Sequence, residues 1–247
     1  MQPLNTQYAT LHTPDKNCPL CPRLVGFRQQ NQLLYVDYFN GAVPAFGGLD
    51  ASLLIVGLAP GLHGANATGR PFTGDFAGDV LYPALVRGGF AVKSLESRVQ
   101  SLDVDKQSEL FRAKGDQTEL WTLDSELYLK GARITNAVRC VPPENKPETV
   151  EIKHCNRFLR DEMAAMPNLK VILTLGLVSH KAVLSALGLK QTAFTFAHGA
   201  VHTIRDSSVN RGQEAEPLVR EALRPIAEAR RPERGQLNIL NSYHTSR

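Results

Sequence analysis

Four short runs of almost unbroken hydrophobic residues recur along the chain, and each ends near residues that favour turns. The runs cover residues 52–58, 133–138, 170–176 and 237–242. Strands buried on both faces of a parallel sheet have this pattern, because helices cover both of those faces. We therefore expect the four runs to be neighbouring strands in the interior of the protein.

Two segments between these runs carry hydrophobic residues at helical spacing. Residues 147–165 begin at a proline, and residues 177–187 end before Gly188, which is the arrangement that helix ends favour. Strands that alternate with helices predict a doubly wound α/β domain. In such domains ligands bind at the carboxyl ends of the strands, so we expect the functional residues to follow these ends.

The composition fits one globular domain that spans residues 1–247, because 43% of its 247 residues are hydrophobic. Residues 206–236 mix arginine with glutamate and contain three prolines, so we interpret them as an insertion with exposed helix. The net charge of +4 permits a nucleic acid as a partner but does not require one.

Neither a secretory signal nor a membrane span is visible in the sequence. The first residues lack a basic region followed by an apolar run, and no apolar stretch approaches the roughly 18 residues that a span requires. We therefore expect a cytoplasmic protein without a membrane partner.

The chain contains four cysteines, Cys18, Cys21, Cys140 and Cys155. Structural disulfides are rare in the cytosol, which favours a metal site. Zinc modules usually repeat a short Cys-x-x-Cys unit, whereas fourteen residues separate the second pair here and Cys155 falls in an expected helix. Iron–sulfur clusters accept ligands scattered over a fold. A [4Fe–4S] cluster is favoured, with zinc and unliganded thiols as the alternatives.

The first run is followed by a glycine-rich loop, residues 57–75, in which five of nineteen residues are glycine. Glycine lets the backbone approach a ligand closely, but the loop matches neither a dinucleotide-binding fingerprint nor a P-loop. It carries Phe72 and Asp75, which could stack on a ring and perform acid–base work. Asn136 ends the second run, where its amide offers donors and an acceptor to a heterocycle.

Six motifs in order carry a resemblance to a known family. They are Cys18-Pro-Leu-Cys21, Gly57-Leu-Ala-Pro-Gly61, Gly69-Arg-Pro-Phe-Thr-Gly-Asp75, Thr135-Asn-Ala-Val-Arg-Cys-Val-Pro-Pro143, Cys155 and His244-Thr-Ser-Arg247. Together they resemble the iron–sulfur uracil-DNA glycosylases of family 5, or type B, over residues 18–204 and 237–247. The family's last motif usually reads His-Pro-Ser, where this chain has Thr245.

The resemblance implies a central parallel four-stranded sheet flanked by helices. It also implies that Cys18, Cys21, Cys140 and Cys155 hold a [4Fe–4S] cluster, which would tie the N-terminal segment to the sheet.

The resemblance further implies a monofunctional repair enzyme that flips a damaged base out of DNA and hydrolyses its glycosidic bond. Two residues would be catalytic. Asp75 would orient or deprotonate the attacking water, and His244 would donate a hydrogen bond to the departing base. The expected partner is DNA that contains uracil or other deaminated bases, and we expect a monomer.

Five residues would bind the substrate if the resemblance holds: Gly57, Ala59, Gly61, Phe72 and Asn136. Phe72 would stack on the flipped base, Asn136 would bond its Watson–Crick edge, and the backbone of the three others would line the pocket. Related branches carry a polar or acidic residue near the first motif glycine. The absence of such a residue here implies a broader range of substrate bases, which includes hypoxanthine. The alternative is a non-catalytic iron–sulfur or zinc module that binds nucleic acid.

Overall fold

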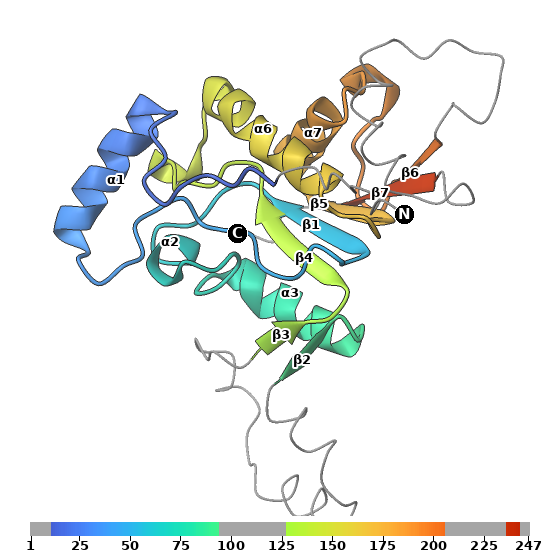
Figure 1. The fold of residues 1–247 in the computed structure, drawn as a ribbon, viewed down its shortest axis with the longest axis horizontal. Helices are drawn as coiled ribbons and strands as arrows, with labels where there is room; N and C mark the ends of the chain where they lie inside the picture. The colour runs from blue at the N-terminus through green and yellow to red at the C-terminus, as the bar shows by residue number, and fades with distance from the viewer. Residues whose placement is uncertain (1–10, 94–126, 206–235, 243–247) are drawn as a thin grey trace, which may run out of the picture.

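The computed structural model describes residues 11–93, 127–205 and 236–242 of the chain. Its centre is a five-stranded sheet with the order β4-β1-β5-β7-β6 (Figure 1). The strands are β1 (Leu53–Gly57), β4 (Ala132–Asn136), β5 (Val171–Leu175), β6 (Val201–Arg205) and β7 (Gln236–Ser242). The predicted insertion at 206–236 lies outside the described residues except for Gln236, which begins β7.

The four hydrophobic runs form β1, β4, β5 and β7, and these strands are parallel to one another, as predicted. The pairing aligns Gly57 with Asn136 at the carboxyl ends of β1 and β4. It also aligns Leu175 with Ser242 at the ends of β5 and β7. The residues that follow these strands therefore lie together at the carboxyl ends of the parallel strands.

The four predicted parallel strands are present, but the predicted number of strands was wrong, because the sheet has five. The fifth strand, β6, pairs with β7 in the antiparallel direction and forms an edge of the sheet. An edge strand needs no continuous hydrophobic run, because much of it faces solvent. Val201 is 61% exposed whereas Ile204 is buried, so β6 lacks the pattern that identified the other four strands.

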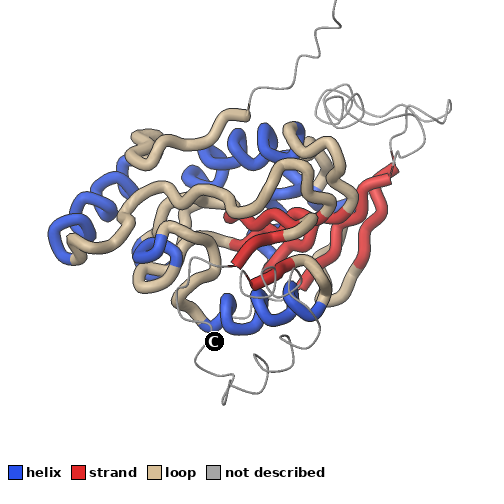
Figure 2. The backbone as a smooth tube through the Cα atoms, turned by 60° about the horizontal axis from the view of Figure 1, so that its bottom comes forward, coloured by secondary structure: helices blue, strands red, loops and turns tan. Residues whose placement is uncertain are grey.

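Helices cover both faces of the sheet (Figures 1 and 2). On one face lie α6 (Thr149–Ala164) and α7 (Leu177–Ala186), which confirm the two predicted helices. The other face is covered by α3 (Phe76–Arg87) and the short pair β2 (Ala91–Lys93) and β3 (Leu127–Leu129). Each face has its own buried hydrophobic core, and β1 contributes side chains to both.

The helix α1 (Pro22–Leu34), which we did not predict, begins directly after the Cys18–Cys21 pair. Its burial does not follow the usual amphipathic pattern. The polar residues Arg28 and Asn31 are buried, whereas Leu33 is 83% exposed. The remaining short elements are α2 (Ala65–Thr68), η2 (Pro143–Asn145) and η3 (Gln191–Ala193). Within the described ranges, no helix is long and apolar enough to cross a membrane.

Candidate functional site

A pocket of about 640 Å³ lies at the carboxyl ends of β1, β4 and β5. It is lined by Leu58, Ala59, Gly61, Ala65, Phe72, Asp75, Phe76, Ala77, Asn136, Asn145, Leu175, Gly176, Leu177, Val178 and Ser179. Five residues singled out from the sequence therefore line one cavity: Ala59, Gly61, Phe72, Asp75 and Asn136. The strand-end position is where ligands bind in α/β sheets.

Gly57 lies where Phe72 and Asn136 meet. A Cβ atom added to Gly57 would come within 2.4 Å of both the Asn136 Oδ1 atom and the Phe72 Cζ atom. Real Cβ contacts are not this short, so only glycine permits the ring and the amide to approach the strand end together. Phe72 is 5% exposed and Asn136 is 4% exposed, so each is held in a fixed position.

The backbone around Phe72 is strained and held by its neighbours. Phe72 has a φ angle of +56°, in the left-handed region that residues other than glycine rarely adopt. The Tyr82 hydroxyl donates to the Pro71 carbonyl at 2.6 Å, and the Thr73 hydroxyl donates to the Arg70 carbonyl at 2.7 Å. Strained residues of this kind cluster at functional sites, where the surroundings maintain them.

Asp75 is the N-cap of α3, and its Oδ1 atom accepts a hydrogen bond from the Gly78 N–H at 2.9 Å. This bond fixes the orientation of the carboxylate and satisfies a free donor of the first helical turn. The Oδ2 atom lies 3.9 Å from the position that a Cβ atom of Gly61 would occupy. The second carboxylate oxygen therefore faces the glycine-rich loop.

His244, the other predicted catalytic residue, lies outside the described part of the chain. The last described residue before it is Ser242, whose carbonyl accepts a hydrogen bond from the Gly176 N–H at 2.7 Å. Gly176 lines the pocket, so β7 ends beside the cavity. The role of His244 stays a prediction.

The four cysteines gather in one region, and none of the four forms a disulfide. They share a hydrophobic cluster with Leu24, Ala42, Val138, Phe158, Leu20, Ala59 and Ile152. Cys140 and Cys155 are buried, and Cys18 and Cys21 are partly exposed. The folded domain therefore brings together two pairs that lie far apart in the sequence. Among the described residues, no three His, Cys, Asp or Glu side chains converge closely enough for a single metal ion.

The surroundings of the thiols disfavour their charged form. Burial, together with the nearby Cys155, Glu151 and Cys18, raises the pKa of Cys21 to about 11. Burial is also the main cause that raises the pKa of Cys140 to about 12, and it raises the pKa of Cys155. Thiolates at this place therefore require a compensating positive charge.

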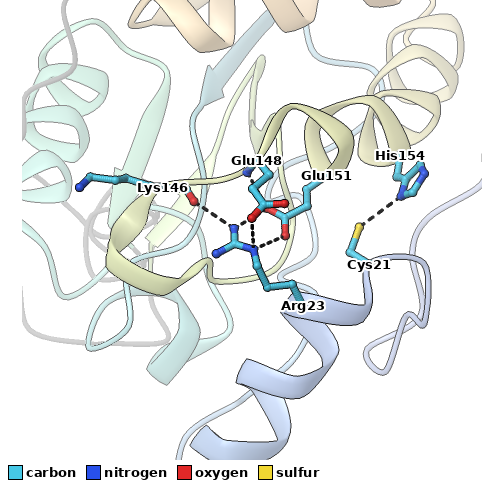
Figure 3. A network of polar contacts seen from close by, with 6 residues as sticks. All are labelled: Cys21, Arg23, Lys146, Glu148, Glu151 and His154. Atoms are coloured by element: carbon cyan, nitrogen blue, oxygen red, sulfur yellow. Dashed lines mark hydrogen bonds and ion pairs between the residues drawn. The ribbon is translucent and has the colours of Figure 1, made fainter.

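Polar groups contact two of the sulfur atoms and the backbone of Cys18. The Arg139 N–H donates to the Cys155 Sγ atom at 3.4 Å, and the His154 Nδ1 atom lies 3.7 Å from the Cys21 Sγ atom (Figure 3). Arg28, itself buried, donates to the Cys18 carbonyl at 3.2 Å. Outer contacts of this kind orient ligands in metal centres.

Two parts of the pocket wall were missed by our reading of the sequence. One is the segment from Leu175 to Ser179, which the strand-end rule would have identified had we applied it to β5. The other is Asn145, which lies in the turn η2 between Cys140 and α6. The Pro142-Pro143 pair before it signals a turn, but no pattern indicates that this turn reaches the pocket.

This chain belongs to the Uracil DNA glycosylase superfamily. The sequence model of that superfamily matches residues 44–247. More specifically, the chain is similar to several proteins named Type-5 uracil-DNA glycosylase. The one from Thermus thermophilus is 38% identical over 188 residues, which cover 74% of each chain.

Two further relatives match to a similar extent. The protein from Pyrobaculum aerophilum is 33% identical over 189 residues, which cover 75% of this chain and 72% of the relative. The protein from Mycobacterium leprae is 35% identical over 192 residues, which cover 74% of this chain and 73% of the relative. The family expected from the sequence motifs is therefore confirmed.

Proposed function

We propose that this protein is a monofunctional glycosylase that excises uracil from DNA. The observation that carries the proposal is the meeting of the Phe72 ring and the Asn136 amide at Gly57, in a pocket that also contains Asp75. A ring and an amide suit the face and the edge of a flipped base. The relatives' names support uracil as the substrate. A non-catalytic binding module is not favoured, because binding alone does not require the carboxylate.

The proposed reaction divides its work among separate residues. Phe72 stacks on the flipped base, and Asn136 bonds its Watson–Crick edge. Asp75 orients the attacking water or removes its proton, and its bond to Gly78 supports this role because it holds the carboxylate still. His244 donates to the carbonyl oxygen on which negative charge develops as the base departs.

A [4Fe–4S] cluster held by Cys18, Cys21, Cys140 and Cys155 is part of the proposal. The four thiols fit it, because they share one hydrophobic region and have an N–H donor at Cys155. When bound, the cluster would supply a structural tie between the N-terminal segment and the sheet.

The proposed substrate range extends beyond uracil. Leu58 and Ala59 line the pocket where related branches have polar groups, and an apolar wall rejects related bases less strongly. We therefore include hypoxanthine and other deaminated bases in DNA. We also propose a cytoplasmic monomer.

The direct test incubates the purified protein with a duplex that carries one uracil, followed by heating in alkali. We expect strand cleavage at the uracil position only after the alkali, because hydrolysis leaves an abasic site. A duplex with thymine at that position is the control. Cleavage of neither duplex would refute the proposed activity.

A methyl group at Gly57 should disrupt the pocket. In Gly57→Ala the new Cβ atom would lie 2.4 Å from both Phe72 and Asn136, so each must move by about 1 Å to reach ordinary contact. A displacement of that size can lower the rate about 10²-fold, which we expect for uracil excision. Gly26→Ala is the matched control, because nothing lies within 4 Å of its added Cβ atom. Equal rates for both variants would contradict the arrangement.

Removal of one thiol should remove the cluster. We expect the purified protein to be yellow-brown and to contain iron, and Cys140→Ala to lose both the colour and the iron. The variant should also be destabilised, because metal binding is coupled to folding. Visible absorbance and elemental analysis measure these outcomes. Stoichiometric zinc without iron in the wild-type protein would show that the cluster assignment is wrong.

A further inference from the structure

The turn η2 is strained at two successive residues. Glu144 has a φ angle of +55° and Asn145 has a φ angle of +56°, and both lie in the left-handed region. This conformation is unfavourable for a glutamate and less so for an asparagine, and it persists where neighbouring groups impose it. The turn connects the segment of Cys140 to α6, which carries Cys155.

Arg23 of α1 holds the end of this turn (Figure 3). Its terminal nitrogen donates to the Lys146 carbonyl at 3.1 Å. The same guanidinium donates two parallel hydrogen bonds to Glu151, at 2.9 and 2.8 Å, and pairs with Glu148 at 3.1 Å. The Glu151 side chain is 2% exposed, so this two-bond contact is shielded from water. Arg23 thus joins α1, the turn and the start of α6.

The Asn145 side chain lies at the rim of the pocket. Asn145 is exposed and lines the cavity, whereas Phe72 and Asn136 are buried deeper within it. Its amide makes no hydrogen bond to another residue in the described ranges. An exposed amide at the rim can therefore donate to a ligand that enters the pocket.

We propose, on the basis of the glycosylase function proposed above, that Asn145 binds the sugar–phosphate backbone of the flipped nucleotide. The base occupies the inner part of the pocket, so its sugar and phosphate lie at the rim, where Asn145 is. Contacts to phosphate fix the position of a nucleic acid without reading the base. Arg23 is the positioning residue, because it holds the strained turn that presents the amide.

The first test is Asn145→Ala. The contact is made equally before and during the reaction, so KM should rise about 10- to 100-fold while kcat stays within about twofold. The rise should be the same for uracil and hypoxanthine, because the phosphate is common to both. Asn168→Ala is the control, since this exposed asparagine precedes β5 at the amino ends of the strands, where its amide donates to the Asp50 carbonyl at 3.1 Å and does not line the pocket. An unchanged KM, or a change for one base only, would overturn the assignment.

Binding measurements separate this inference from the proposed activity. Fluorescence anisotropy with a duplex that carries a tetrahydrofuran abasic-site analogue requires no reaction. Asn145→Ala should bind this duplex about 10- to 100-fold more weakly than the wild-type protein. A wild-type protein that fails to excise uracil would refute the proposed function, whereas equal binding by the variant would refute the Asn145 contact.

A double-mutant cycle tests the role of Arg23. If Arg23 acts through Asn145, then Arg23→Ala should raise KM in the wild-type background and have almost no further effect in the Asn145→Ala background. Additive effects would show that Arg23 acts by another route. Iron content is measured for each variant. If Arg23→Ala loses the cluster, Arg23→Lys takes its place in the cycle, because it keeps the charge but cannot make the paired bonds to Glu151.

Discussion

Asp75→Asn should lower the rate of uracil excision about 10²–10⁴-fold, the loss expected when a general base is removed. Asparagine is the informative substitution, because its side-chain oxygen can still accept the hydrogen bond from the Gly78 N–H that caps α3. The fold and the binding of DNA should therefore stay close to those of the wild-type protein. The lower rate of uracil excision would then result from the loss of a carboxylate that accepts a proton.

Single-turnover kinetics with saturating enzyme measure this rate without contributions from binding or product release. Asp79→Asn is the matched control, because it makes the same change of charge in the first turn of α3 at an exposed residue that does not line the pocket. If Asp75→Asn excises uracil at the wild-type rate, another group activates the water and the proposed division of roles fails.

Glu162→Gln should destabilise the protein by about 3–5 kcal/mol, the usual result of breaking a buried ion pair. Glu162 is 1% exposed and accepts from Arg133 at 2.6 Å, from the Thr135 hydroxyl at 3.0 Å, and from Arg139. Removal of its charge leaves two buried guanidinium groups without an anion. The effect should reach the site, because Arg133 and Thr135 precede Asn136 on β4.

Chemical unfolding of the purified protein, followed by circular dichroism, measures the change in the free energy of unfolding. Glu144→Gln is the control. Its ion pair with Lys146 has side chains that are 78% and 80% exposed, and exposed pairs contribute at most about 1 kcal/mol. Similar decreases in the free energy of unfolding for the two variants would show that the buried ion pairs of Glu162 stabilise the protein no more than an exposed ion pair does.

The sequence predicted the strands that carry a continuous run of hydrophobic residues. The strands β1 and β4 are buried almost throughout, and β5 and β7 mostly alternate between buried and partly buried residues, but all four carry the hydrophobic runs that identified them. The edge strand β6 and the helix α1 lack such a signal. In α1 the buried face carries Arg28, which donates to the Cys18 and Asn17 carbonyls, while Leu33 is exposed. Tertiary contacts of this kind cannot be read from hydrophobic spacing.

The candidate site was predictable where local motifs coincide with strand ends. Phe72, Asp75 and Asn136 lie in such motifs, and the structure brings them to one pocket. Asn145 was missed because its place depends on a left-handed turn held by a residue more than a hundred positions away. Glu162 was missed because a glutamate in an amphipathic helix is ordinarily solvated, and only the fold brings two arginines to it.

The most direct test of the central claim identifies the released product. The purified protein is incubated with a duplex that contains a single uracil, and mass spectrometry analyses both the free bases and the intact strands. We predict one free uracil for each site, together with an unbroken strand that carries an abasic site. An unaltered uracil-containing strand, with no free base, would contradict the assignment of this pocket to uracil excision.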